Sequence, residues 1–324
     1  MNGMICITGT TGFIGSNLLA HLAGKGKRVK VLLRPGAVLR SEHDQALVIR
    51  GDIRDPGAAK ELLKGSDCLI HLANVYRHQV STIEEMRAIN VEATLALFEE
   101  AVEQGVRRIV YISSAGVHRH TGEMVDESVP LNTETGDPYE KHKIACEKHL
   151  RELSRQSGTE TVVLRPATVY GPGDKRLAPL FNMIRSGKFF FIGGGDNYVS
   201  WIFIQDLVEV IEAGVERPEA SGKAYLVTGS DVLTLRELAS LIAEIQGKEA
   251  PTLSLPVFPF TIGAAICEKL CPVLGVQPPI HRARLRFFTD SLRYSSKKIK
   301  SELGALLDTP LQKGLRITIQ GMKG

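Results

Sequence analysis

Residues 9–15 read Gly-Thr-Thr-Gly-Phe-Ile-Gly, and they directly follow a short apolar run at residues 4–8. The spacing of Gly9, Gly12 and Gly15 lets a backbone turn sharply, approach a pyrophosphate closely and pack a helix against a strand. A helical pattern follows at residues 17–23, so free N–H groups and the helix dipole would face a bound anion. A simple turn would also use these glycines, but their place between the first strand and a helix favours dinucleotide binding.

Short β-rich runs alternate with helical patterns through the first half of the chain, which is typical of β-α-β units with helices on both faces of a parallel sheet. We therefore expect an α/β fold, a Rossmann-like doubly wound parallel sheet with a smaller mixed C-terminal substrate domain. The predicted strands are residues 4–8, 29–33, 47–50, 68–72, 108–113 and 161–165, and the predicted helices are residues 17–23, 58–63 and 89–103.

The 324 residues suggest one large domain or two unequal ones. Beyond residue 170 the alternation weakens, glycine and proline become more frequent, and residues 251–279 are rich in proline. We assign residues 1–170 to a dinucleotide-binding domain, to which about residues 200–228 return, and residues 171–199 and 229–315 to a substrate-binding domain.

Composition excludes several classes of protein. A chain that is 43% hydrophobic and 23% charged is an ordinary globular protein, and a net charge of +4 is too dilute to indicate nucleic acid binding. The five cysteines form no C-x-x-C pair, which favours a reduced, cytoplasmic protein, and no secretory signal is expected at the N-terminus. The apolar stretch at residues 256–266 is too short to span a bilayer, so we expect no integral membrane segment. We expect a buried helix or a pocket wall there, in preference to a surface-associated segment.

Histidines give no sign of a metal site. His118, His120 and His142 lack metal-ligand spacing, and we expect them on exposed loops or helix surfaces. No metal is predicted.

The end of the second predicted strand bears on the choice of cofactor. Residues 31–36 read Val-Leu-Leu-Arg-Pro-Gly, with no carboxylate to accept a ribose 2′-hydroxyl and with Arg34 available for a 2′-phosphate. NADP is therefore favoured, with NAD as the alternative, although Arg34 would also suit a solvated strand end.

Residues 137–143 read Asp-Pro-Tyr-Glu-Lys-His-Lys, with an aspartate suited to cap a helix and a proline suited to its first turn. Tyr139 and Lys143 are four residues apart and share a helix face that continues as an apolar stripe. A lysine in such a stripe makes chemical sense if its ammonium lowers the pKa of the neighbouring phenol. A snorkelling lysine beside a core tyrosine is the alternative.

Ser113 and Ser114 end the predicted strand 108–113, at the edge where parallel sheets bind ligands. A glycine-rich loop, a strand-end serine and Tyr-x-x-x-Lys, in that order, resemble the short-chain dehydrogenase/reductase superfamily. More narrowly, the sequence resembles its extended branch, the NAD(P)-dependent epimerase/dehydratase family. Further matches at residues 51–53, 71–73, 90–94 and 164–174 extend the resemblance over about residues 1–310.

The resemblance implies a hydride-transfer site. Tyr139 would be the general acid/base, Lys143 would lower its pKa and hold the nicotinamide ribose, and Ser114, with Ser113 as the alternative, would hydrogen-bond the reacting oxygen. Cofactor contacts are implied at Gly9, Thr11, Gly12, Phe13, Ile14, Gly15, Arg34, Asp52, Ile53, Leu72, Ala73, Asn74, Asn90, Lys143, Pro166, Thr168 and Val169.

Departures from the family pattern narrow the choice of substrate. Ala115 and Gly116 replace the Asp-Glu pair of sugar-nucleotide dehydratases, and Thr168 stands where epimerases often have an asparagine. These features favour a less charged substrate, as in relatives that resemble 3β-hydroxysteroid dehydrogenases and dihydroflavonol reductases. A group of four arginines in the C-terminal region favours a phosphate-bearing substrate, although a solvated face explains the group equally well. These arginines are Arg282, Arg284, Arg286 and Arg293.

The sequence therefore predicts an NAD(P)(H)-dependent oxidoreductase that transfers hydride to or from a secondary alcohol or ketone of a small molecule. The enzymic alternative is a nucleotide-sugar epimerase that retains NAD(P), and the non-enzymic alternative is a cofactor-sensing binding protein. Similar proteins commonly form dimers through helices beside the active site, so a homodimer is a further expectation.

Overall fold

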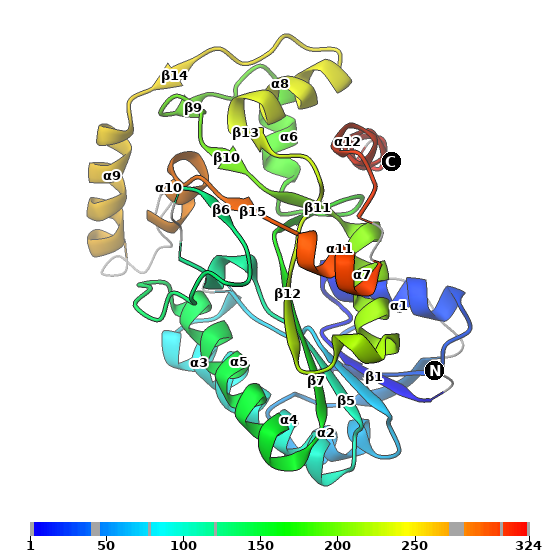
Figure 1. Cartoon of the computed structure of the whole chain (residues 1–324). Helices are drawn as coiled ribbons and strands as arrows, with labels where there is room; N and C mark the ends of the chain where they lie inside the picture. The colour runs from blue at the N-terminus through cyan, green and yellow to red at the C-terminus, as the bar shows by residue number, and fades with distance from the viewer. Residues whose placement is uncertain are drawn as a thin grey trace.

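A computed structural model describes residues 3–39, 46–76, 79–119, 122–271, 282–304 and 307–322. Its centre is a seven-stranded sheet in the order β12-β7-β5-β4-β1-β2-β3, in which every pairing is parallel (Figure 1). The strands are β1 (Ile5–Thr8), β2 (Val29–Leu33), β3 (Ala46–Arg50), β4 (Cys68–His71), β5 (Arg108–Ile112), β7 (Glu160–Pro166) and β12 (Lys223–Val227).

Strand β1 lies between β2 and β4, and Ile7 pairs with Val31 on one side and with Ile70 on the other. The strand order reverses here, and such a switch point opens a crevice beyond the carboxyl ends of the strands. The glycine-rich loop follows β1, so the fold places it at this crevice.

Helices cover both faces of the sheet, which confirms the predicted doubly wound architecture. On one face lie α1 (Phe13–Gly24) and α7 (Ile204–Glu216). The other face carries α2 (Pro56–Leu63), α4 (Ala93–Glu103) and α5 (Pro138–Ser157), and a short helix α3 (Ile83–Arg87) leads through a π-helical turn (Ala88–Glu92) into α4. Each face has its own apolar core, because the buried strands present side chains to both sides.

Most of the remaining elements lie beyond the carboxyl ends of the strands, toward the top of Figure 1, whereas α11 (Lys297–Leu303) packs beside β12. They include four two-stranded ladders: β8 with β11, β9 with β14, β10 with β13, and β6 with β15. The strands are β6 (Met124–Val125), β8 (Thr168–Tyr170), β9 (Phe191–Ile192), β10 (Tyr198–Val199), β11 (Trp201–Phe203), β13 (Leu233–Thr234), β14 (Ser254–Leu255) and β15 (Arg293–Tyr294). The helices are α6 (Ala178–Arg185), α8 (Leu235–Ile245), α9 (Val257–Leu270), α10 (Arg282–Thr289), α11 (Lys297–Leu303) and α12 (Leu311–Gln320).

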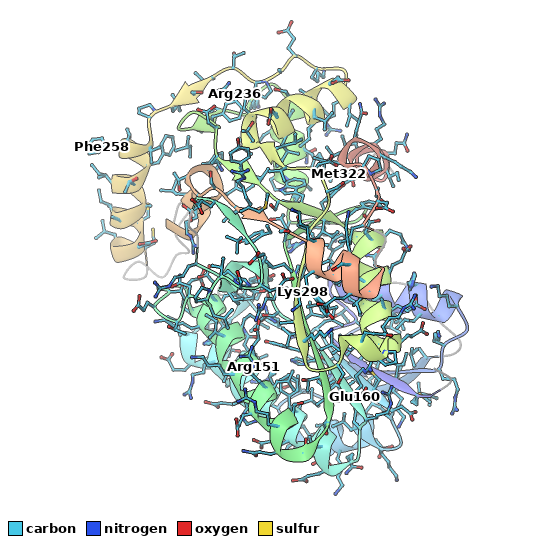
Figure 2. The ribbon with its side chains drawn as sticks, in the orientation of Figure 1. Arg151, Glu160, Arg236, Phe258, Lys298 and Met322 are labelled. Carbon is cyan, nitrogen blue, oxygen red and sulfur yellow. The ribbon has the colours of Figure 1, made fainter. Side chains whose placement is uncertain are left out.

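Helix α9 contains the apolar stretch expected to be buried or to wall a pocket, and that expectation is wrong for much of the helix. Phe258 is 71% exposed and Ile266 is 51% exposed, and Figure 2 shows Phe258 on the outer side of α9. Only Ala264 is fully buried among the described side chains of the helix. A short apolar helix has the same sequence pattern whether one face or all faces are covered, so periodicity alone did not distinguish these cases. No helix within the described ranges is long and apolar enough to cross a membrane.

Two of the three histidines expected on the surface are buried, which corrects that expectation. His118 is 0% exposed and bonds the carbonyl of Val129 through Nδ1, and His142 is 9% exposed. His120 lies outside the described residues. Across the described part of the chain, no group of three or more His, Cys, Asp or Glu side chains is arranged to hold a metal ion.

Candidate active site

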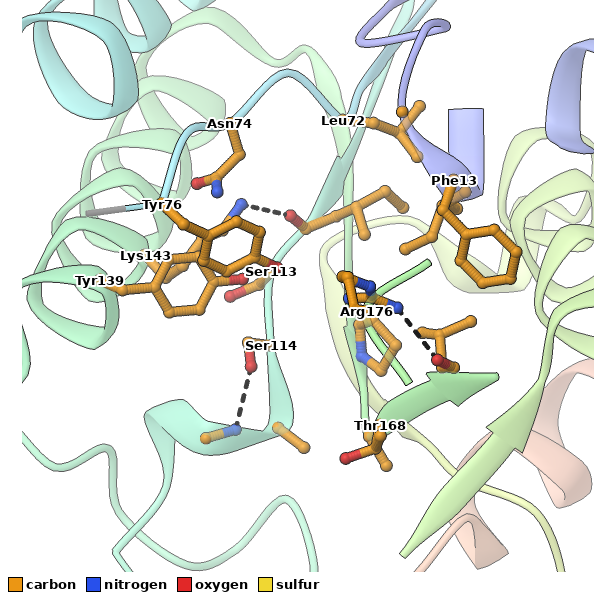
Figure 3. A pocket seen from close by; sticks show the side chains of 18 of the residues that line it. Phe13, Leu72, Asn74, Tyr76, Ser113, Ser114, Tyr139, Lys143, Thr168 and Arg176 are labelled. Atoms are coloured by element: carbon orange, nitrogen blue, oxygen red, sulfur yellow. Dashed lines mark hydrogen bonds between the residues drawn. The ribbon is translucent and has the colours of Figure 1, made fainter. Parts of the chain in front are cut away.

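A cavity of about 680 Å³ opens at the carboxyl end of the sheet. Its walls come from the glycine-rich loop, the ends of β4 and β5, the start of α5, the β7–β8 segment and the region from α10 to β15 (Figure 3). Because segments distant in sequence converge here, this cavity is the candidate site.

The glycine-rich loop forms one side of the cavity, and its glycines are required by close contacts. A Cβ on Gly9, whose φ is +80°, would lie 2.7 Å from the nitrogen of Ala73, and a Cβ on Gly15 would lie 2.2 Å from the carbonyl oxygen of Gly9. Helix α1 begins directly after Gly12 with no side-chain cap and no acidic residue in its first turn. The buried hydroxyl of Thr10 also has no hydrogen-bond partner. These residues fit a dinucleotide, because the uncapped helix start leaves N–H groups for its pyrophosphate.

The residues predicted for the adenosine end lie outside the cavity walls. Arg34 is exposed just after β2. Asp52 accepts two hydrogen bonds from the guanidinium of Arg54, of 2.7 and 3.0 Å, and a third from its main-chain N–H. These interactions lower the pKa of the carboxyl, with a smaller contribution from Arg34. Ile53 is half-buried beside it and packs against the apolar core.

The segment after β4 lines the cavity directly beside the glycine-rich loop. Leu72 and Asn74 line the cavity, whereas Ala73 lies behind it and donates its N–H to the hydroxyl of Thr8 at 3.2 Å. The amide of Asn90 bonds both the N–H and the carbonyl of Val75, each at 2.8 Å. Asn90 therefore holds this segment from outside the cavity.

Helix α5 brings Tyr139 and Lys143 to the cavity wall. The helix starts where the sequence predicts, because Asp137 caps it by accepting the N–H of Tyr139 at 2.8 Å. Nζ of Lys143 donates to the main-chain oxygen of Ile112 at 2.8 Å and lies 5.8 Å from the centre of the Tyr139 ring. Burial lowers the pKa of Lys143 to about 8.

The pKa of Tyr139 differs from the expectation that Lys143 would lower it. Burial of the ring raises the pKa of Tyr139 well above its usual value, Tyr76 raises it further, and a hydrogen bond from Ser114 offsets only part of this. The groups that shift this pKa most are Tyr76, Ser114 and Arg176, and Lys143 is not one of them. Tyr139 is therefore protonated and can act as a proton donor.

The two strand-end serines have different partners. The hydroxyl of Ser113 donates to Glu147, a buried carboxylate, so it is committed to an internal contact. Ser114 Oγ accepts the N–H of Gly116 at 3.2 Å and interacts with Tyr139. The geometry favours Ser114 over Ser113 for contact with a reacting oxygen.

Several residues that line the cavity were not singled out from the sequence, and they include Tyr76 and Arg176. The Tyr76 ring stacks on Tyr139, with centroids 5.1 Å apart and planes at 25°. Figure 3 shows this pair on one side of the cavity, with Arg176 and Phe13 on the other. The guanidinium of Arg176 lies 5.6 Å from the centre of the Phe13 ring. A tyrosine five residues after the strand-end His71 carried no recognisable signal in the sequence.

Arg286 also lines the cavity, but it lies between two carboxylates. It donates to Glu140 at 3.0 Å and to Asp290 at 2.8 Å. Arg293, another member of the basic group, lies outside the cavity walls, with its guanidinium 4.5 Å from the centre of the Tyr198 ring. The side chains of Arg282 and Arg284 lie outside the described residues.

Residues 5–228 match the model of the NAD-dependent epimerase/dehydratase family. The chain belongs to this family. Membership accounts for the convergence of a glycine-rich loop, a strand-end serine and the Tyr-Lys pair on one cavity.

Individual relatives within the family carry different activities. The chain is 26% identical to a 3beta-hydroxysteroid-dehydrogenase/decarboxylase isoform 1 of Arabidopsis thaliana, over 97% of this chain and 78% of that protein. It is 29% identical to a 2-alkyl-3-oxoalkanoate reductase of Stenotrophomonas maltophilia, over 96% and 97%. It is 30% identical to a UDP-glucose 4-epimerase of Vibrio cholerae, over 98% and 94%.

A UDP-glucose 4-epimerase from Thermotoga maritima, solved with UDP-glucose, shares the fold with a TM-score of 0.78 and 21% identity over 99% of this chain and 98% of the other. As a member of a family described as NAD-dependent, the protein is an enzyme of the oxidoreductase and epimerase type. Its relatives include both net oxidoreductases and sugar-nucleotide epimerases, so the family alone does not choose between these reactions.

Proposed function

We propose that this family member is an NADP(H)-dependent oxidoreductase that interconverts a ketone and a secondary alcohol on a small, mainly apolar molecule. Tyr139, Lys143 and Ser114 are the proposed catalytic residues. Residues 171–199 and 229–315 form the proposed substrate-binding domain.

The state of Arg286 is the observation that carries this proposal. A diphosphate-bearing substrate needs cationic partners in the pocket. Arg286 is the pocket residue from the basic group, yet its hydrogen bonds go to Glu140 and Asp290. Release of Arg286 toward a diphosphate would leave the buried carboxylate of Glu140 without its cationic partner and with only the hydroxyl of Thr135, which is costly. This pairing supports a substrate with less charge than a sugar nucleotide.

Proton transfer is the proposed task of Tyr139. The nicotinamide supplies or accepts the hydride when the cofactor is bound. Because burial keeps Tyr139 protonated, its hydroxyl can donate a proton to a ketone oxygen. Ser114, which interacts with Tyr139, would hold the same oxygen, and Lys143 would bind the nicotinamide ribose.

NADP is the proposed form of the cofactor. Residues 31–36, at the end of β2, have no carboxylate for the ribose 2′-hydroxyl, and the exposed Arg34 is close enough to Asp52 to affect its pKa. A 2′-phosphate at this position would meet a guanidinium. Adenosine contacts from Asp52 and Ile53 are part of the same proposal.

A nucleotide-sugar epimerase that retains its cofactor is the second candidate, because the Vibrio cholerae epimerase is 30% identical over almost the whole chain. The two candidates separate on cofactor turnover. The proposed oxidoreductase should consume NADPH in proportion to ketone added, and it should leave UDP-glucose unchanged. Interconversion of UDP-glucose and UDP-galactose on tightly retained cofactor, with no net oxidation of NADPH by any ketone, would refute the proposal.

A further inference from the structure

Arg176 lines the cavity from the loop that leads from β8 to α6, and one buried carboxylate holds it there. Its Nε donates to Asp174 at 3.0 Å and its Nη2 to the other oxygen of Asp174 at 2.9 Å, while Nη2 also donates to the carbonyl of Val169 at 3.1 Å. The side chain of Asp174 is 1% exposed, whereas that of Arg176 is 48% exposed. The guanidinium is therefore fixed along one edge, although about half of the side chain remains exposed.

The fixed guanidinium contacts the glycine-rich loop. It lies 5.6 Å from the centre of the Phe13 ring, a distance at which a cation is attracted to an aromatic face. The turn before it meets the same ring, because a Cβ on Gly171 would lie 3.5 Å from Cζ of Phe13. Phe13 is the first residue of α1, where the N–H groups have no partner within the helix. The loop that carries Arg176 therefore packs against the proposed pyrophosphate site.

The glycine-rich loop and α1 carry no full positive charge at this site. Residues 9–24 contain no lysine or arginine. They offer an anion only N–H groups and about half an elementary charge from the helix dipole. The pyrophosphate of a dinucleotide is an anion, and a charged donor binds a phosphate oxygen about twice as strongly as a neutral donor does. A cation from another part of the chain would therefore complete the site.

The other cations that line the cavity are less suited to this task. Lys143 is buried and donates to the main-chain oxygen of Ile112, and Arg286 is bonded by two carboxylates. Lys175 is exposed, and no hydrogen bond or ion pair within the described part of the chain fixes its side chain. Arg176 has both a fixed position and a contact with the first residue of α1.

We propose that Arg176 binds the pyrophosphate of the cofactor and that Asp174 is the positioning residue that orients its guanidinium. This inference rests on the proposed dinucleotide site, and it holds for either candidate reaction because both use a nicotinamide dinucleotide. Residues 171–176 lead into the proposed substrate-binding domain. The same contact would therefore hold one wall of the substrate pocket against the bound cofactor.

The test measures binding in the absence of turnover. Fluorescence titration gives the dissociation constants of NADPH and NADH, and calorimetry gives that of ADP-ribose, which has the pyrophosphate but no nicotinamide. Arg176→Gln should weaken the binding of all three ligands by a common factor of about ten, because each loses one charge-assisted contact. The matched control Lys175→Gln removes the neighbouring exposed charge, and it should change each constant by less than about twofold, since solvent screens an exposed charge.

Two further variants separate binding from folding. Arg176→Gln leaves the buried carboxylate of Asp174 without its partner, which is costly. The double variant Asp174→Asn/Arg176→Gln removes both charges, and it should show the same loss for all three ligands. Asp174→Asn alone keeps the guanidinium but releases its fixed edge, so it should weaken the three ligands by a smaller common factor. Thermal unfolding of each variant shows that the fold is retained.

Four results would overturn the inference. The first is unchanged dissociation constants in both variants that lack the guanidinium of Arg176. A loss confined to NADPH would assign the guanidinium to the 2′-phosphate, and a loss for NADPH and NADH but not for ADP-ribose would assign it to the nicotinamide half. An equal loss in Lys175→Gln would show that general positive charge, and not a positioned guanidinium, attracts the ligand.

Failure of this inference and failure of the proposed function give different results. NADPH binding that is insensitive to Arg176→Gln overturns the inference and leaves the oxidoreductase function standing. The expected loss of binding, together with sugar-nucleotide interconversion and no net oxidation of NADPH, supports the inference and overturns the oxidoreductase function. A wild-type protein that binds none of the three ligands overturns both.

Discussion

Lys143 donates a hydrogen bond of 2.8 Å from its ammonium to the main-chain oxygen of Ile112, the last residue of β5. The bond ties helix α5 to the end of a central strand, beside the position of Tyr139. Because the ammonium is buried, its pKa falls to about 8, and this value has a direct consequence for activity.

We expect kcat/KM to fall as pH rises through about 8, because the free enzyme then loses the charge on Lys143. Lys143→Arg should move this alkaline limb to higher pH, since a guanidinium stays charged, and Lys143→Met should lose most activity at every pH. A pH profile of kcat/KM for the wild type and both variants measures this. A wild-type profile that stays flat to about pH 10 would contradict the role of the ammonium.

Tyr139→Phe should bind the cofactor almost as well as the wild type but lose about 10²- to 10⁴-fold in kcat, because the proton donor is gone while the ring remains. Tyr76→Phe serves as a matched control, since it removes the hydroxyl of the stacked neighbour, and its kcat should fall far less. Cofactor binding is followed by fluorescence and turnover by NADPH consumption. Undiminished kcat in Tyr139→Phe would remove this residue from the mechanism.

The features that could be predicted from the sequence are those whose structure depends on residues close together in the chain. The loop after β1 requires a glycine at position 9, where φ is +80°. The start of α5 requires a capping residue, which is Asp137. The pairing of Arg286 with Glu140 joins residues 146 positions apart, and nothing local in either segment indicates it. The buried position of His118 likewise depends on Arg165 in a separate strand.

Arg34→Ala should weaken NADP binding by about tenfold or more and leave NAD binding nearly unchanged, because only NADP carries the 2′-phosphate that a guanidinium would meet. The comparison needs dissociation constants for both cofactors with both proteins. Arg50, which bonds the main-chain oxygen of Ala37 nearby, offers a control substitution to alanine that should not change the preference. Equal losses for the two cofactors in Arg34→Ala would remove this arginine from cofactor selection.

A buried charge network behind the cavity should dominate the effects of mutation on stability. Arg165 donates to both carboxylate oxygens of Glu147 and, through Nη1, to Nε2 of His118 at 3.0 Å. The side chains of Glu147 and Arg165 are 2% and 4% exposed. Loss of one partner leaves an uncompensated charge in a medium of low dielectric constant.

Glu147→Gln should therefore lower the free energy of unfolding by about 3–5 kcal/mol, although glutamine has nearly the same shape. The control is Glu134→Gln, which removes the partner of Arg119 in an ion pair whose side chains are 81% and 51% exposed. It should cost less than about 1 kcal/mol, because solvent screens exposed pairs. Urea denaturation of the two variants at neutral pH measures the difference, and similar losses would contradict the buried-pair argument.

The same network predicts how the free energy of unfolding depends on pH. Burial, with a contribution from Arg165, lowers the pKa of His118 to about 4, below the value of about 6.5 expected in the unfolded chain. Between these values the unfolded state binds more protons, so the His118 contribution is fully present above about pH 6.5 and is lost as pH falls through about 4. His118→Gln keeps a polar side chain that does not titrate, so its free energy of unfolding should decline less steeply across this window. Parallel curves for the two proteins would show that another group is responsible.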